Sequence, residues 1–164
     1  MHKILYFGGQ KSGKSHLAEQ KTLSLATKKP YYIATYENNF GDSEMERRVK
    51  KHQLQRVDRF HTIEEGKDLV SVIKAGETYL IDCVSMWILN NITEDENTLL
   101  EQIERLGNID ANLVFVLNDV GSGVIPLDKE SRKYVDMSGI IGQKLAFICT
   151  EVYEVKMGIG IKIK

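Results

Sequence analysis

The segment GGQKSGKS, from Gly8 to Ser15, decides how the amino-terminal part of this chain folds. It fits the pattern G-x-x-x-x-G-K-[ST] in full, which is typical of a loop whose backbone N–H groups surround phosphate oxygens. An apolar stretch at 3–7 precedes the segment, and residues with helical spacing follow from 14 to about 27. Strand, glycine-rich loop and helix are the context that this pattern requires, so the sequence predicts a phosphate-binding loop here.

The side chains of this loop match the chemistry of a nucleoside triphosphate. We expect Lys14 to neutralise the β- and γ-phosphates and Ser15 to ligate Mg²⁺. The N-terminus of the following helix adds the positive end of its dipole. The remaining predicted phosphate contacts are Gly8, Gly9, Gln10, Lys11, Ser12 and Gly13.

Outward from this segment, short apolar stretches alternate with helical ones. We predict strands at 3–7, 31–35, 59–63, 78–83 and 112–117, and helices at 14–27, 43–56, 64–75, 84–92, 96–106 and 128–149, the last with a break near Gly139. Residues 151–164 alternate in polarity and predict an edge hairpin. The pattern predicts an α/β fold: a three-layer P-loop NTPase-like domain with a mainly parallel sheet and an antiparallel C-terminal edge hairpin, with 1–164 as a single domain.

Asp82 ends the apolar stretch YLID and is the second candidate for the site. In parallel sheets, ligands bind beyond the carboxyl ends of the strands. In a fold with a phosphate loop, such a carboxylate lies beside the magnesium ion, so we expect Asp82 to share the metal with Ser15. The alternative is a solvated aspartate at the end of a strand.

His52 lies in a strongly basic segment, ERRVKKHQLQR, where helical spacing puts Arg48, His52 and Arg56 on one face. A neutral imidazole among cations can act as a nucleophile toward phosphorus, and the neighbouring cations would hold phosphates. The alternative is a solvated basic face that carries one histidine. The residues alone favour that second interpretation.

Composition bounds the remaining function classes. The net charge is −1, which argues against non-specific binding to nucleic acid or to acidic membranes. No apolar stretch approaches the roughly 18 residues that span a bilayer, and no signal peptide is visible. The chain has 2 cysteines, Cys83 and Cys149, in apolar contexts, where we expect core packing rather than a disulfide. We therefore expect a cytoplasmic protein.

Further motifs follow one another along the chain: YYIAT from Tyr31, EMERRVKKHQLQR from Glu44 to Arg56, LIDCVSMWILN from Leu80, NDVGSGVIP from Asn118, and a C-terminal GIGIKIK. With these motifs the chain resembles the adenosylcobinamide kinase/adenosylcobinamide-phosphate guanylyltransferase family over nearly its whole length. The spacing M-x-x-R-(V/I)-x-x-H-x-x-x-R, from Met45 to Arg56, and the NDVGSGVIP loop carry the resemblance more specifically than the phosphate loop does.

The resemblance implies a bifunctional enzyme of cobalamin biosynthesis. Such enzymes phosphorylate the aminopropanol hydroxyl of adenosylcobinamide, then transfer GMP from GTP to that phosphate through a GMP-histidine intermediate, at the position of His52. It also implies GTP, or ATP for the kinase step, a corrinoid acceptor and a homo-oligomer, as trimers. The nucleotide contacts that it implies are Ala34, Thr35, Tyr36, Gln53, Leu54, Gln55, Arg56, Glu64 and Asp82.

The chain departs from the family pattern at two positions. Asp119 stands where the family often has glutamate, and Gly142 replaces an asparagine. Both bear on the corrinoid side rather than on the nucleotide side. Two other hypotheses stay open from the sequence: a small-molecule kinase without guanylyl transfer, and a catalytically degenerate GTP-binding module.

Overall fold

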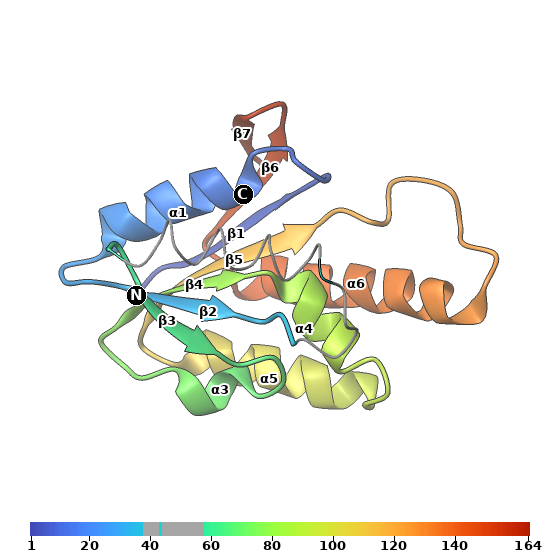
Figure 1. Ribbon diagram of the computed structural model, residues 1–164, viewed down its shortest axis with the longest axis horizontal. Helices are drawn as coiled ribbons and strands as arrows, with labels where there is room; N and C mark the ends of the chain where they lie inside the picture. The colour runs from blue at the N-terminus through green and yellow to red at the C-terminus, as the bar shows by residue number, and fades with distance from the viewer. Residues whose placement is uncertain (38–42, 44–57) are drawn as a thin grey trace.

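The computed structural model describes residues 1–37, 43 and 58–164 (Figure 1). Its strands are β1 (Lys3–Gly8), β2 (Tyr31–Ala34), β3 (His61–Glu64), β4 (Thr78–Asp82), β5 (Asn112–Asn118), β6 (Glu151–Lys156) and β7 (Ile159–Lys162). Its helices are α1 (Lys14–Leu25), α3 (Leu69–Val72), α4 (Val84–Asn90), α5 (Glu96–Asn108) and α6 (Lys129–Ile148).

The strands form one seven-stranded sheet in the order β3-β2-β4-β5-β1-β6-β7. All neighbouring pairs are parallel except β6 and β7, which form an antiparallel hairpin at one edge. Helix α1 covers one face of the sheet, and α3 to α6 cover the other (Figure 1). The predicted α/β fold, with its mainly parallel sheet and its antiparallel C-terminal edge hairpin, is confirmed.

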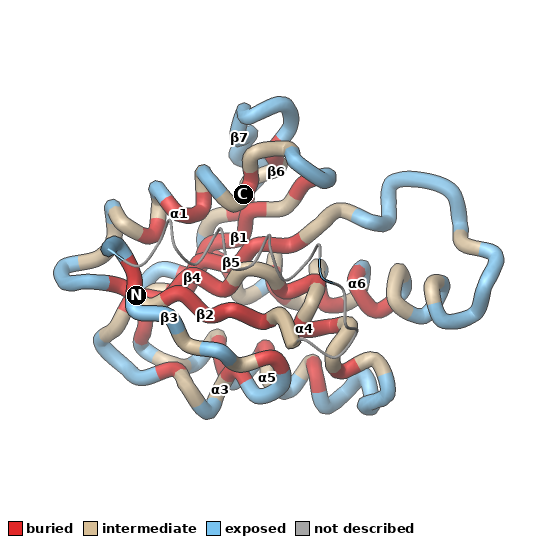
Figure 2. The backbone as a smooth tube through the Cα atoms, in the orientation of Figure 1, coloured by how far each residue is buried: buried red, intermediate tan, exposed pale blue. Residues whose placement is uncertain are grey.

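Each face of the sheet has its own apolar cluster, because successive side chains of a strand point to opposite faces. In β1, Ile4 packs on the side of α1, and Leu5 packs on the side of the four other helices. Trp87 of α4 is fully buried in the larger cluster, and its indole N–H donates to the carbonyl of Lys67. Figure 2 shows this buried centre as a continuous band along the strands.

Two predictions about helices are wrong. The helix expected at 64–75 is reduced to Leu69–Val72, because Glu64 still belongs to β3 and Asp68 caps the short helix through the N–H of Ser71. No break occurs near Gly139, since α6 runs from Lys129 to Ile148 and keeps its buried face against the sheet.

The predicted polar helix at 43–56 lies outside the described residues, apart from Ser43. Among the residues that the structure describes, none of the helices is both long and apolar enough to cross a membrane.

Candidate active site

The carboxyl ends of the parallel strands meet at one edge of the sheet, and the predicted site residues gather there. The strand register pairs Gly8 with Asn118, and pairs Ala34 with both Asp82 and Glu64. The phosphate loop, Asp82, the end of β2 and Glu64 therefore lie along the same edge, as the parallel arrangement predicts.

The phosphate loop is a tight turn between β1 and α1. Lys11 and Gly13 have positive φ angles of 55° and 96°, and the N–H of Ser12 donates to the carbonyl of Gly9 at 3.2 Å. Helix α1 begins at Lys14 directly after this turn. Its first N–H groups and the positive end of its dipole thus face the loop, which is an arrangement suited to anions.

The Lys14 side chain folds back over the loop that precedes it. Its Nζ donates to the carbonyl of Gly9 at 3.0 Å, and the residue is 7 % exposed. Burial lowers the pKa of Lys14, while the negative charge of Asp82 opposes that shift. An ammonium has three hydrogen-bond donors, so this lysine keeps donors for further acceptors.

Ser15 and Asp82 form the next part of the site. The Ser15 hydroxyl donates to Oδ1 of Asp82 at 3.4 Å, and the Tyr32 hydroxyl lies 3.4 Å from Oδ2. The hydroxyl and carboxylate oxygens are hard ligands of the type that Mg²⁺ prefers. Ser15 and Asp82 are thus placed together, as the sequence predicted, whereas the sequence did not predict the part that Tyr32 takes in this contact.

The end of β2 is tied to the end of β4 by one buried side chain. Thr35 is 1 % exposed; its Oγ1 donates to the carbonyl of Cys83 at 2.7 Å and accepts from the Cys83 N–H at 3.1 Å. The Asn90 amide donates to the carbonyl of Thr35 at 2.7 Å. These bonds fix the backbone beside Asp82, so Thr35 supports the site through its hydroxyl.

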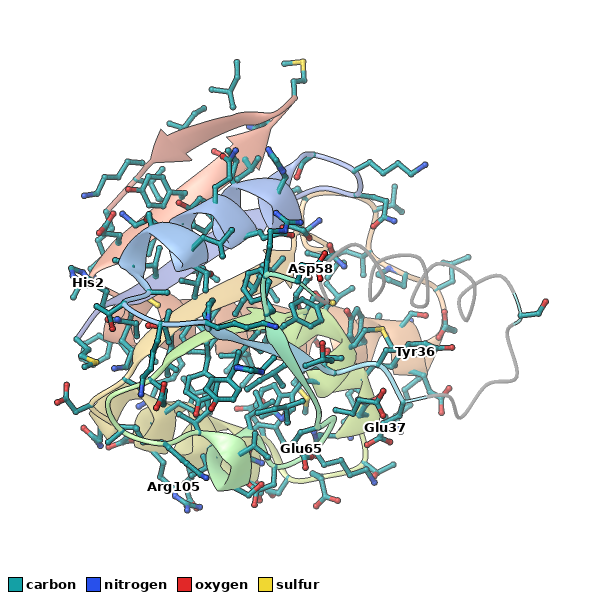
Figure 3. The ribbon with its side chains drawn as sticks, turned by 60° about the vertical axis from the view of Figure 1, so that its left-hand side comes forward. His2, Tyr36, Glu37, Asp58, Glu65 and Arg105 are labelled. Atoms are coloured by element: carbon teal, nitrogen blue, oxygen red, sulfur yellow. The ribbon has the colours of Figure 1, made fainter. Side chains whose placement is uncertain are left out.

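Tyr36 and Glu37 continue the chain beyond β2 (Figure 3). The Tyr36 hydroxyl is buried and has no hydrogen-bond partner among the described residues. Glu64, the other predicted contact on this side, is exposed at the end of the edge strand β3. A phenolic hydroxyl without a partner is a polar group that a bound ligand can satisfy.

Cys83 is half-buried at the start of α4 and packs against the apolar cluster on the α1 face of the sheet, in line with the expected core packing. Burial, with the negative charge of Asp82, raises the pKa of its thiol to about 11. The thiol is therefore protonated near neutral pH and is a poor nucleophile. Cys149 is fully buried, as expected.

The segment 119–127 begins beside the phosphate loop, where the N–H of Asp119 donates to the carbonyl of Gly8 at 2.9 Å. The Asp119 carboxylate accepts from the Ser122 hydroxyl at 2.7 Å and from the Gly121 N–H at 3.3 Å. The Asp119 side chain closes a turn through these two bonds. An aspartate, although shorter than the glutamate that the family often has here, is therefore held in one position. A side chain on Gly142 would meet Leu117 at 3.4 Å, an ordinary contact.

The β6–β7 turn also contacts the phosphate loop, a contact that the sequence did not predict. The N–H of Gly158 donates to the carbonyl of Ser12 at 2.7 Å. Nothing in the sequence signals this bond, because it depends on β6 lying next to β1 in the sheet.

The remaining predicted residues, His52 and its neighbours Gln53, Leu54, Gln55 and Arg56, lie outside the described residues. In the described part of the chain, no group of three or more His, Cys, Asp or Glu side chains could hold a metal ion.

Comparison with known proteins identifies the family. Residues 4–163 match the family described as cobinamide kinase / cobinamide phosphate guanyltransferase. The chain is 34% identical over 171 residues to the bifunctional adenosylcobalamin biosynthesis protein CobP of Pseudomonas aeruginosa, covering 98% of this chain and 96% of that protein. It is 31% identical over 183 residues to each of the CobU proteins of Escherichia coli and Salmonella typhimurium, covering 98% of this chain and 99% of each.

A solved structure from Pyrococcus horikoshii OT3 shares the fold, with a TM-score of 0.57 at 12% identity, over 99% of this chain and 86% of that one. At this identity the likeness concerns the fold alone. The match along nearly the full length, together with the phosphate loop and its facing carboxylate, shows that the chain belongs to the bifunctional cobinamide kinase / cobinamide phosphate guanyltransferase family of cobalamin biosynthesis.

Proposed function

We propose that this chain acts as one domain that phosphorylates adenosylcobinamide and then transfers GMP from GTP to the product, with both reactions at the carboxyl edge of the sheet. The observation that carries the proposal is the arrangement around the phosphate loop, where Ser15 Oγ lies 3.4 Å from Asp82 Oδ1 and Lys14 folds over the same loop. Family membership supplies the reaction class.

In the kinase step, the acceptor hydroxyl oxygen bonds to the γ-phosphorus of ATP or GTP as the bond to the β–γ bridging oxygen breaks. The nucleoside diphosphate leaves, and the hydroxyl gives up its proton. Lys14 and the first N–H groups of α1 stabilise charge on the phosphate oxygens. Ser15 and Asp82 would hold Mg²⁺, which supplies further neutralisation of the phosphates when it is bound.

In the second step, an imidazole nitrogen of His52 bonds to the α-phosphorus of GTP as pyrophosphate leaves. A phosphate oxygen of adenosylcobinamide phosphate then bonds to the same phosphorus, and the nitrogen–phosphorus bond breaks. Support for His52 is the spacing from Met45 to Arg56, with cations at both ends for the departing pyrophosphate.

We assign the nucleoside side of the site to residues beyond β2 and β3 and to the segment after His52. The proposed contacts are Ala34, Thr35, Tyr36, Gln53, Leu54, Gln55, Arg56 and Glu64. The buried Tyr36 hydroxyl without a partner in the described part of the chain supports this choice. Tyr36→Phe should then raise the KM for GTP.

The corrinoid acceptor is assigned to the segment 119–127. Val124, Ile125 and Leu127 are 94%, 76% and 97% exposed there, and the segment is bonded at its start to the phosphate loop. The apolar rim of a corrinoid macrocycle can pack on these exposed side chains while its aminopropanol arm reaches the phosphate loop. Leu127→Asp should raise the KM for cobinamide and leave the KM for nucleotide unchanged; an unchanged KM for cobinamide would reject this placement.

We further propose a homo-oligomer, as trimers, that forms through the β7 edge, where Ile159, Ile161 and Ile163 are 64%, 47% and 58% exposed. An edge strand with exposed apolar side chains favours pairing with another chain. Trp87 of α4 is fully buried and so offers no contact surface of its own. Ile161→Lys should lower the mass measured by light scattering.

We also propose a cytoplasmic location, which is supported by the two cysteines, Cys83 and Cys149, being free thiols. Fractionation of cells that produce the protein tests it.

The decisive experiment uses GTP labelled in its α-phosphate, with Mg²⁺ and without acceptor. The wild type should retain label covalently, and His52→Ala should lose all of it while still binding GTP. His61→Ala is the matched control, because His61 is an exposed histidine at the start of β3 and should keep the label. Phosphorylation of cobinamide without any α-phosphate labelling would favour a simple kinase, and binding of GTP without either reaction would favour a degenerate module.

A further inference from the structure

The C-terminal hairpin reaches the phosphate loop through its turn. The N–H of Gly158 donates to the carbonyl of Ser12 at 2.7 Å, which makes this one of the shortest backbone bonds between distant segments. Figure 1 shows the turn between β6 and β7 close to the loop that joins β1 to α1.

Steric contacts show how closely the two segments are packed. A Cβ atom added to Gly8 would lie 2.4 Å from the carbonyl oxygen of Val155, and one added to Gly13 would lie 3.0 Å from Cα of Gly158. Real Cβ atoms do not come as close as 2.4 Å, so Gly8 requires glycine. The contact at Gly13 is tighter than nine in ten real Cβ contacts, and its φ of 96° also favours glycine there. The absence of a side chain at these two glycines of the phosphate loop thus lets the hairpin approach closely, independently of any phosphate.

The conformation of the turn makes the Gly158 N–H available. Lys156 pairs with Ile159, so Met157 and Gly158 form a two-residue turn, and their φ angles are 51° and 80°. Positive φ at both positions is typical of the type I′ turn, which matches the twist of a hairpin. The N–H of Gly158 takes no part in the ladder of the hairpin and donates instead to the loop.

In the phosphate loop, the bond from Gly158 reaches Ser12, a residue that is held by backbone hydrogen bonds. Ser12 donates its N–H to Gly9 and accepts from Gly158 through its carbonyl. Its hydroxyl is buried and lacks a partner among the described residues, so it contributes no hydrogen bond to the loop there. Ser12 directly precedes Gly13 and Lys14, and its position sets where α1 begins.

We propose that the β6–β7 turn is a positioning element for the phosphate loop, in which Gly158 holds Ser12 and thereby presets the backbone N–H groups and Lys14 for a triphosphate. The proposal rests on the proposed binding of nucleotide at this loop. A loop that is already in its bound conformation loses less entropy on binding, so the hairpin should raise nucleotide affinity without touching the nucleotide.

The chain offers a matched pair of glycines for the test. Gly76 has a φ of 83°, close to that of Gly158, and a Cβ on either glycine would meet nothing within 4 Å. Gly76 also donates its N–H to a distant carbonyl, that of Asp110, at 2.8 Å. Valine disfavours positive φ, so Gly158→Val and Gly76→Val impose the same backbone strain on two turns, one beside the phosphate loop and one before β4 at the opposite end of the sheet.

The Kd for Mg²⁺–GTP is measured by calorimetry for folded wild type and both variants. We expect Gly158→Val to raise the Kd about tenfold and Gly76→Val to leave it unchanged, although both should lower the Tm. Gly158→Asn should restore affinity, because asparagine tolerates a left-handed backbone. An unchanged Kd in Gly158→Val, or an equal rise in Gly76→Val, would overturn the proposal.

A second measurement covers the case in which Gly158→Val does not fold. Coupling between two sites is reciprocal, so GTP should slow hydrogen exchange of the wild-type turn more than that of the turn at Gly76. Equal exchange in the turn with and without bound GTP would reject the proposal. If the wild type binds no GTP at all, the proposed function fails. If it binds GTP and the turn does not respond, only the positioning role of the turn fails.

Discussion

The two ends of β1 each lie beside a buried lysine, Lys3 at the amino end and Lys14 just beyond the carboxyl end, 5% and 7% exposed. Lys3 donates to the carbonyls of Ile109 and Ala111, both at 2.8 Å, and Lys14 donates to the carbonyl of Gly9 at 3.0 Å. Figure 3 labels His2, the neighbour of Lys3, on the side of the molecule away from Tyr36 at the site. The two lysines thus have similar burial but different surroundings.

Burial lowers the pKa of both side chains, and a nearby aspartate opposes the shift in each case, Asp110 for Lys3 and Asp82 for Lys14. Neither burial nor the direction of the pKa shift therefore separates a structural lysine from a functional one. The hydrogen-bond partners do, because Lys3 joins two backbone segments, whereas Lys14 keeps donors at the end of a helix where anions are favoured.

The largest expected effect comes from exchanging each lysine for methionine. Lys14→Met should lower turnover by about 10²–10³-fold, because charge on the transferring phosphate loses a preorganised cation. Lys3→Met should leave turnover per folded molecule unchanged and lower the free energy of unfolding by about 2–4 kcal/mol, because two charge-assisted bonds are lost and two carbonyls lose a donor. Steady-state kinetics and urea unfolding measure the two effects.

The two variants control for each other, since the substitution and the burial are the same. The comparison fails if Lys3→Met loses turnover as Lys14→Met does, or if Lys14→Met destabilises the protein as much as Lys3→Met does. Unfolding of Lys14→Met should stay within about 1 kcal/mol of wild type, because one bond to a loop carbonyl is lost.

The placement of several candidate site residues followed from the sequence. The loop motif fixes both ends of its own segment, so Lys14 and Ser15 follow directly from local spacing. Asp82 followed from a general property of parallel sheets, which places strand ends together without a need to know their order. The sheet type and the edge hairpin followed from the alternation of apolar and helical segments.

Contacts that depend on the order of the strands in the sheet could not be predicted from the sequence. Tyr32 reaches Asp82, and Thr35 reaches Cys83, because β2 lies beside β4. Gly158 reaches Ser12 because β6 lies beside β1. An apolar stretch predicts a strand but does not state its neighbour, so these partners could not be assigned.

A second pair of variants sharpens the contrast between the two ends of the sheet. At the carboxyl end, Thr35→Val leaves the N–H and the carbonyl of Cys83 unpaired, which should lower the free energy of unfolding by about 1–3 kcal/mol and also raise the KM for nucleotide. At the amino end, Asn112 bonds the His2 N–H and the Thr78 hydroxyl. Asn112→Ala should cost about 1 kcal/mol and leave the KM unchanged.

Thermal unfolding and nucleotide titration of both variants test this contrast. Thr35→Ser is the rescue, because it keeps the hydroxyl, and it should recover the KM. A rise in KM for Asn112→Ala equal to that for Thr35→Val would show that the site responds to any loss of stability rather than to its own supports.

The smallest expected effect is a proton linkage that belongs to Lys14 alone. Burial lowers the pKa of Lys14 in the free protein below the ordinary lysine value of 10.5, and a bound triphosphate should raise this pKa again, because the anion stabilises the ammonium. The contribution of Lys14 to affinity is then complete below its lowered pKa in the free protein and is lost as the pH rises through its higher pKa in the complex. Calorimetry of Mg²⁺–GTP binding in two alkaline buffers of different ionisation enthalpy should therefore show proton uptake. Lys14→Met should abolish this uptake and Lys3→Met should keep it, because Lys3 lies at the opposite end of β1 and its donors already serve two carbonyls; uptake that persists in Lys14→Met would place the titrating group elsewhere.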